Sequence, residues 1–202
     1  MARLSIMQQA LGDSWAQLPE ALKAHYQPND NVDVGWLSID YPRWIQVYLN
    51  LLHAIGALLN RRGAELPAQV SKRMQGDTQY WSRCIVTREG REVRFSSRWQ
   101  YAGGNEVIEY VNRLLGLRMA VRVERGVLHY SGVHIVLKIG RMKLPIPEWL
   151  ALGHTTIEET ALGGTSFRMD FRLQHPWFGQ LYRYHGVFRT RNDDCVASVV
   201  DE

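Results

Sequence analysis

A two-residue alternation of apolar and polar side chains, which begins near residue 69, constrains most strongly how this chain can fold. In the clearest stretch, residues 91–101, Val93, Phe95 and Trp99 alternate with charged residues such as Arg94 and Arg98. Successive side chains of a β-strand point to opposite faces, so the pattern predicts a strand with one buried and one solvated face. This is the usual condition of an antiparallel sheet.

Similar stretches, separated by short turns rich in glycine, recur along the chain. We predict strands at 34–41, 68–74, 79–87, 91–101, 117–124, 128–139, 155–161, 165–173 and 181–190, whereas 105–116 fits either a strand or a short helix. The expected inner face of 128–139 consists of Val133, Ile135, Leu137 and Ile139. Pro145 and Pro147 lack amide donors, so 144–147 is expected at a rim or crossing of the sheet.

The run Trp44–Leu59 is nearly uncharged and predicts a hydrophobic helix. Gln46, Asn50 and His53 form one narrow polar stripe, and the remaining circumference is apolar. Each large apolar side chain left in water would forfeit roughly 1.5–3 kcal/mol, so we expect the strands to wrap this helix. The run is shorter than the roughly 20 residues of a spanning helix, and no transmembrane segment is predicted.

Taken together, these patterns predict an α+β fold. We expect a curved antiparallel sheet or half-barrel of about eight strands packed around the hydrophobic helix, with short N-terminal helices in residues 7–26. The chain should form a single domain, 1–202, with frayed tails at 1–6 and 191–202. Cys84 and Cys195 provide no disulfide framework, which favours a cytoplasmic location.

Composition excludes some functional classes. The chain is 46% hydrophobic with a net charge of +4, which is typical of a globular protein and well short of a dedicated nucleic-acid binder. Six arginines alternate with apolar residues on three strands, and they are interpreted as a solvated sheet surface in preference to an anion- or RNA-binding patch. They are Arg94, Arg98, Arg118, Arg122, Arg168 and Arg172. The mild basic excess is compatible with acidic ligands or with peripheral contact to anionic lipid headgroups.

Few residues suggest catalysis. The seven histidines show no spacing typical of a metal site, so no metal and no cofactor are expected. Glu159 and Glu109 are weak candidates for a general acid or base, because an inward carboxylate between apolar neighbours would be desolvated. The alternative is that both lie at strand ends or on the solvated face.

Two irregular segments are better candidates for a ligand-binding rim, because binding residues often lie on loops carried by a rigid scaffold. The candidates are Pro145, Pro147 and Trp149 in the first segment, and His175, Trp177 and Phe178 in the second. The alternative is that Trp149 and Trp177 only plug the ends of the sheet.

Several short motifs resemble a known family. They are Trp81-Ser82-Arg83, Phe95-Ser96-Ser97, Gly126–Tyr130, Leu144–Leu150, Phe167–Phe171, His175–Gly179 and Tyr184-His185-Gly186. This set resembles the bacterial domain family of unknown function DUF4166. The resemblance implies that the domain also occurs fused behind saccharopine dehydrogenase-like or epimerase-like NAD(P)-binding domains. This chain shows no Gly-x-Gly-x-x-Gly motif after a strand, so dinucleotide binding is not carried over.

Three functional hypotheses follow. The first is a non-enzymatic binding domain with an apolar cavity for a lipid-like or other hydrophobic small molecule. The second, implied by the family's fusions, is an accessory domain that docks onto an oxidoreductase-like partner. The third is an enzyme that uses Glu159 or Glu109. We favour the first, because large apolar and aromatic residues are in excess on the expected inner faces.

Overall fold

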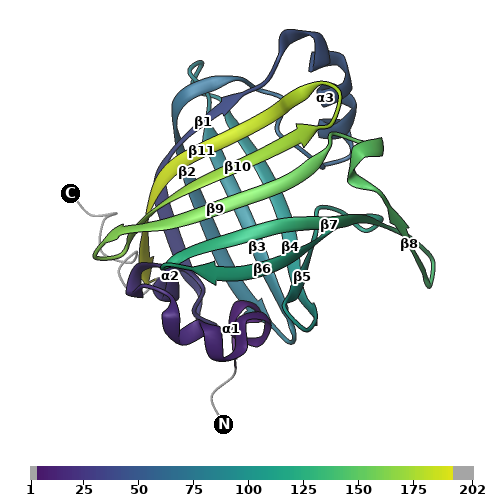
Figure 1. The fold of residues 1–202 in the computed structure, drawn as a ribbon. Helices are drawn as coiled ribbons and strands as arrows, with labels where there is room; N and C mark the ends of the chain where they lie inside the picture. Colours follow the sequence, from purple (N-terminus) through teal and green to yellow (C-terminus); the bar gives the residue numbers. More distant parts are fainter. Residues whose placement is uncertain (1–3, 193–202) are drawn as a thin grey trace.

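The computed structural model describes residues 4–192, which are built mainly from β-strands (Figure 1). The helical segments are α1 (Ile6–Leu11), η1 (Gly12–Gln17), α2 (Glu20–His25), η2 (Arg43–Ile45), α3 (Gln46–Ala54) and η3 (Glu148–Leu150). The strands are β1 (Asn31–Asp40), β2 (Gly63–Gln75), β3 (Thr78–Val86), β4 (Glu92–Gly103), β5 (Glu106–Tyr110), β6 (Leu115–Glu124), β7 (Val127–Ile139), β8 (Met142–Ile146), β9 (His154–Gly163), β10 (Ser166–His175) and β11 (Gly179–Asn192).

Ten of these strands close into an antiparallel barrel. β1 pairs with β2 on one side and with β11 on the other, and the ring continues through β6, β7 and β9. β8 lies outside the ring, where it pairs with the second half of β7. Pro145 lies in this outer strand, as expected for a residue that lacks an amide donor.

The predicted open sheet or half-barrel is therefore wrong. The pairings of β6 with β7 and of β7 with β9 join the two edges of the sheet. Of the described residues 4–192, 59% are in strands and 18% in helices, so α+β also describes the fold poorly. Alternation marks the individual strands, but it carries no information about which strands pair across the ring.

The prediction that the strands wrap the hydrophobic helix is also wrong. α3 has only nine residues and lies across one end of the barrel (Figure 1). Leu49 is buried, whereas Val47 is 81% exposed and Trp44 and Leu51 are also exposed. The helix ends before Gly56, which has a positive φ of 72°. The barrel interior is instead lined by side chains from the strands.

The predicted N-terminal helices are present and cover the opposite end of the barrel. Ser5 begins α1 with a capping box, in which its hydroxyl accepts from the Gln8 amide and the Gln8 side chain accepts from the Ser5 amide. Met7 and Leu22 are fully buried against the barrel end. Residues 1–3 and 193–202, which contain Cys195 and most of the predicted tails, lie outside the described residues.

The two ends of the barrel are named after these helices. The α3 end contains the connections 41–62, 87–91, 111–114, 140–153 and 176–178. The α1 end contains residues 4–30 and the connections 76–77, 104–105, 125–126 and 164–165. Figure 1 places α3 at the top and α1 at the bottom of the barrel.

The barrel wall divides near the α3 end. β7 pairs with β9 from Val127 to Ser131 and with β8 only from Ile135 onward. A register shift against β6 leaves Val133 without a partner in that pairing, so the inward positions change from even to odd numbers there. The prediction that Val133 and Ile139 face inward is wrong, whereas Ile135 does line the interior. Val133 is exposed at the register shift, and Ile139 is exposed because it lies beyond the last pairing with β6 and pairs only with Met142 of β8.

Within residues 4–192, no helix combines the length and apolar character needed to cross a membrane.

Candidate functional site

An apolar cavity of about 400 Å³ lies inside the barrel towards the α3 end. Inward side chains of the strands form its walls, among them Val70, Ile85, Leu117, Met169 and Phe171. These residues occupy alternate positions of their strands, so the two-residue period that builds the sheet also lines the cavity.

Two short helical segments cover the cavity at the α3 end. Tyr48 and Leu52 of α3 contribute to its lining, as do Leu150 and Leu152 in and after η3. Tyr48 and Leu52 are four residues apart, so they share one face of α3. α3 therefore closes the cavity with one face and exposes apolar residues on another.

Polar residues interrupt the apolar wall at Gln69, at Arg83 and Glu109, and at Glu148 and Thr155. Arg83 and Glu109 belong to a cluster of three hydrogen-bonded side chains. Arg83 Nη2 lies 2.9 Å from Glu109 Oε1, and Arg83 Nη1 donates to Ser97 Oγ at 2.8 Å. Ser97 in turn donates to the same Glu109 oxygen at 2.6 Å. The guanidinium also lies over the rings of Trp81 and Phe95. We call Arg83, Ser97 and Glu109 the Arg83 cluster.

Glu109 was a candidate from the sequence, and the structure places it in the cavity wall beside a cation. Arg83 was not a candidate. The sequence could have identified Arg83, because it interrupts an inward-facing row of β3 with a charge. The alternate residues of this row are Gln79, Trp81, Arg83 and Ile85. The partner Glu109 lies on a different strand, and that pairing could not be predicted.

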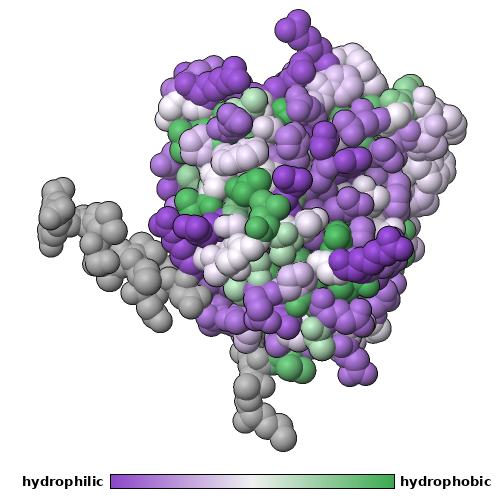
Figure 2. All heavy atoms as spheres, turned by 60° about the vertical axis from the view of Figure 1, so that its left-hand side comes forward, coloured by the Kyte–Doolittle hydropathy of each residue, from purple (hydrophilic) through white to green (hydrophobic). Residues whose placement is uncertain are grey.

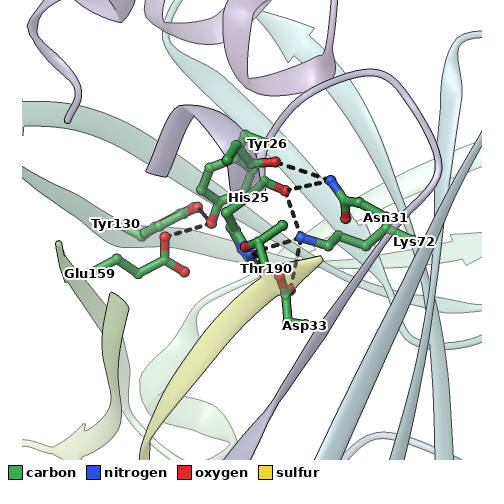
Figure 3. A network of polar contacts seen from close by, with 9 residues as sticks. His25, Tyr26, Asn31, Asp33, Lys72, Tyr130, Glu159 and Thr190 are labelled. Carbon is green, nitrogen blue, oxygen red and sulfur yellow. Dashed lines mark hydrogen bonds and ion pairs between the residues drawn. The ribbon is translucent and has the colours of Figure 1, made fainter. Parts of the chain in front are cut away.

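Glu159, the preferred carboxylate candidate, lies in a separate buried network near the α1 end (Figure 3). Its Oε2 accepts a hydrogen bond of 2.7 Å from the Tyr26 hydroxyl, which also bonds the hydroxyl of Tyr130. Burial raises the pKa of Glu159 to about 7. Burial likewise raises the pKa of the Tyr26 and Tyr130 hydroxyls, so both remain protonated donors.

The same network contains a buried ion pair that sequence analysis missed. Asp33 Oδ2 lies 2.8 Å from Lys72 Nζ and 2.9 Å from His25 Nδ1, and Thr190 donates to Asp33 Oδ1 at 2.7 Å. Burial alone would raise the pKa of Asp33, but its contacts with His25 and Lys72 hold the pKa well below its usual range. Burial lowers the pKa of His25 to about 4, so its imidazole is neutral at neutral pH.

The network joins α2 to the barrel. His25 and Tyr26 belong to the end of α2, and their partners Asp33, Lys72 and Glu159 lie on β1, β2 and β9. Glu159 is not among the described residues that line the apolar cavity. We therefore interpret this network as the anchor of the helical cover at the α1 end.

The rim residues proposed from the sequence gather at the α3 end. Pro147, Trp149 and His175 line an outer groove of about 700 Å³ together with His154 and Pro176. His175 Nδ1 accepts from the Trp177 amide at 3.2 Å, so the proton resides on Nε2, which donates to the Trp149 carbonyl at 2.9 Å. This histidine ties η3 to the turn between β10 and β11.

A second histidine fixes η3 to the barrel wall. Glu148 Oε2 lies 2.8 Å from His154 Nδ1, and Glu148 Oε1 accepts from the Thr155 amide at 3.1 Å. Ser131 Oγ lies 3.2 Å from His154 Nε2. Gly132 makes room for this carboxylate, because a Cβ there would lie 1.9 Å from Glu148 Oε1. η3 thus bridges the divided wall between β7 and β9.

Among residues 4–192, no group of three or more His, Cys, Asp or Glu side chains is arranged to hold a metal ion.

These features define a class of protein: a closed ten-stranded antiparallel barrel with helical covers at both ends and an internal, mainly apolar cavity whose wall contains a few polar residues. The family model described as "Domain of unknown function (DUF4166)" matches residues 18–188, so the chain belongs to this family, and the resemblance seen in its motifs is confirmed. No curated protein and no solved structure matches the chain.

Proposed function

We propose that this protein binds a lipid-like or other hydrophobic small molecule inside the barrel. The observation that carries the proposal is the apolar cavity of about 400 Å³ at the α3 end. Small-molecule sites usually have volumes of about 300–1,000 Å³ and combine apolar walls with a few polar groups. The cavity has both properties.

The Arg83 cluster indicates which end group the ligand carries. A guanidinium has five N–H donors, and the hydrogen bonds of Arg83 to Ser97 and Glu109 use two of them. The remaining donors can bind an oxygen atom of the ligand. Because Glu109 already neutralises Arg83, a carboxylate ligand would bring an uncompensated charge into an apolar cavity, which is costly. The cavity therefore favours an uncharged amphiphile with a hydroxyl or carbonyl end.

A cavity-filling variant tests the proposal. Met169 faces the cavity from β10, so Met169→Trp places a larger ring in the space that the ligand would occupy. Thr160→Trp is the matched control, because Thr160 is exposed on the adjacent strand β9. Binding of the uncharged fluorescent dye phenylnaphthylamine is measured by titration. We expect Met169→Trp to weaken binding at least about tenfold and Thr160→Trp to leave it unchanged.

Circular dichroism establishes that both variants are folded. A folded Met169→Trp protein that takes up the dye as wild type does would overturn the proposal. Native mass spectrometry of protein purified without detergent, followed by denaturing extraction, then identifies any bound compound. An uncharged amphiphile at one molecule per chain is the expected result.

A further inference from the structure

The α3 end exposes a connected row of aromatic side chains beside the cavity. Trp44 contacts Phe178, His175 contacts both Phe178 and Trp177, and Trp177 contacts Trp149, with ring centroids 4.8–6.0 Å apart. We call these five residues the aromatic row. Trp44 is 63% and Trp177 is 74% exposed, and Phe178 and Trp149 are also exposed, whereas His175 is buried and connects them. The row spans η2, η3 and the turn between β10 and β11.

Further apolar side chains extend this surface over α3 and η3. Val47 and Leu51 on the outer face of α3 are exposed, as is Leu150 of η3. α3 and η3 are also the segments that cover the cavity. The same two segments, α3 and η3, therefore cover the cavity on their inner side and expose apolar residues on their outer side.

Positive charge is concentrated at the same end. The connections of the α3 end carry eight basic residues, which are Arg43, Arg61, Arg62, Arg88, Arg91, Arg113, Arg141 and Lys143, against the acidic residues Glu89 and Glu148. The described connections of the α1 end carry Lys23 and Arg125 against Asp13, Glu20, Asp30 and Asp77. Figure 2 shows strongly hydrophilic side chains projecting along the upper end of the molecule, which is the α3 end.

We propose that the α3 end docks onto the surface of an anionic lipid bilayer. Tryptophan and phenylalanine side chains insert readily between headgroups and acyl chains, and surrounding arginine and lysine are attracted to anionic lipids. Neither property alone specifies a membrane, but here both occur on one end and the opposite end has the opposite charge balance. The exposed aromatic residues and the basic charge of the α3 end are therefore complementary to a bilayer that has anionic headgroups above an apolar interior.

The inference rests on the proposed function in one respect. Docking at this end places the cover of the cavity, formed by α3 and η3, against the lipid from which a hydrophobic ligand would enter or to which it would leave. The wall division between β7 and β9 lies at the same end and is bridged by η3.

The test is co-sedimentation of the protein with vesicles of phosphatidylcholine, with and without about one quarter phosphatidylglycerol. We expect binding to the anionic vesicles, little binding to phosphatidylcholine alone, and weaker binding as salt increases. Arg61→Glu/Arg62→Glu should reduce partitioning onto anionic vesicles about tenfold or more. Trp44→Ala/Trp177→Ala should also reduce it, by removing the inserted rings.

Matched controls lie at the α1 end. Arg122→Glu/Arg125→Glu reverses two charges there, and Tyr101→Ala removes an exposed ring from β4 near that end. Both should bind vesicles as wild type does. Equal binding to neutral and anionic vesicles, no binding to either, or an equal loss in the controls would overturn the inference. Light scattering that shows a dimer abolished by Trp44→Ala/Trp177→Ala would also overturn it, because a second copy would then cover the surface.

The two proposals fail separately. Met169→Trp changes the cavity but not the outer surface, so it should lose the dye and keep vesicle binding. The Arg61→Glu/Arg62→Glu protein should lose vesicle binding and keep the dye, which also shows that this variant is folded.

Discussion

The Tyr26 hydroxyl lies 2.7 Å from Oε2 of Glu159, and both side chains are fully buried where α2 meets β9. This hydrogen bond connects the helical cover to the barrel wall through a carboxyl group that ionises with difficulty. Attachment of the cover should therefore be stronger when the Glu159 carboxyl is protonated than when it is ionised.

Glu159 should make stability depend on pH. Its pKa is raised from 4.5 in the unfolded chain to about 7 in the folded protein, so between these values the folded state binds more protons. The free energy of unfolding contributed by Glu159 therefore falls as the pH rises from about 4.5 to about 7, by about 3 kcal/mol in total. His25, whose pKa is lowered to about 4, contributes in the opposite direction between pH 4 and 6.5.

Glu159→Gln isolates the first contribution, because the amide does not titrate. Relative to wild type, this variant should gain stability between pH 5 and pH 8, measured as the free energy of unfolding in urea. Glu158→Gln, at an exposed neighbouring position, is the control and should show no such gain. Parallel pH profiles for wild type and Glu159→Gln would show that the buried carboxyl does not titrate in this range.

The Asp33–Lys72 pair should be strongly coupled. The side chains of both are almost completely buried, so Lys72→Met leaves an uncompensated carboxylate and should cost about 3–5 kcal/mol. Replacing both partners in Lys72→Met/Asp33→Asn should recover much of that loss. A double-mutant cycle by urea unfolding measures the coupling. Additive losses from the two single changes would mean that the pair contributes no coupling energy.

The two-residue periodicity predicted most of the individual strands of the barrel. The alternation between Val93 and Trp99 defines β4 correctly, because each side chain's face depends only on its own strand. Closure of the ring depends on which strands pair, for example β7 with β9, and local sequence carries no signal for this. The prediction that the strands wrap the helix beginning near Trp44 was wrong for another reason. A long apolar run predicts burial on most sides, but α3 covers the cavity with one face and exposes apolar residues on another.

The polar sites were partly predictable. Lys72 and Arg83 each occupy a position where the alternation of their strand calls for an apolar residue, so both could have been recognised as inward charges that need partners. Their partners Asp33 and Glu109 lie on other strands and meet them only through the register of the folded sheet. Asp33 lies just outside the predicted strand 34–41, because β1 begins at Asn31, earlier than its weak alternation indicates.

Close approach of β1 and β11 should make Gly186 intolerant of any side chain. A Cβ at this position would lie 2.1 Å from the carbonyl oxygen of Trp36, a backbone atom that cannot easily move. Gly186→Ala should therefore destabilise the barrel by about 1–3 kcal/mol or more. Arg189→Ala, an exposed substitution on the same strand, is the control. Equal melting temperatures for wild type and Gly186→Ala would contradict the close packing of these strands.

Glu109→Gln should change which ligands the cavity accepts. In the wild type Glu109 neutralises Arg83 at 2.9 Å, so we expect lauryl alcohol to displace phenylnaphthylamine more effectively than laurate does. Removing the negative charge leaves Arg83 without a counterion, and a ligand carboxylate can then supply it. Laurate should bind the Glu109→Gln protein at least about tenfold more tightly than it binds wild type, while the affinity for lauryl alcohol should change little.

Glu106→Gln is the matched control, because the Glu106 carboxylate pairs with Arg118 on the neighbouring strand β6. If the preference between alcohol and acid is the same in all three proteins, the Arg83 cluster does not contact the ligand's polar end, and the ligand is held by the apolar walls alone.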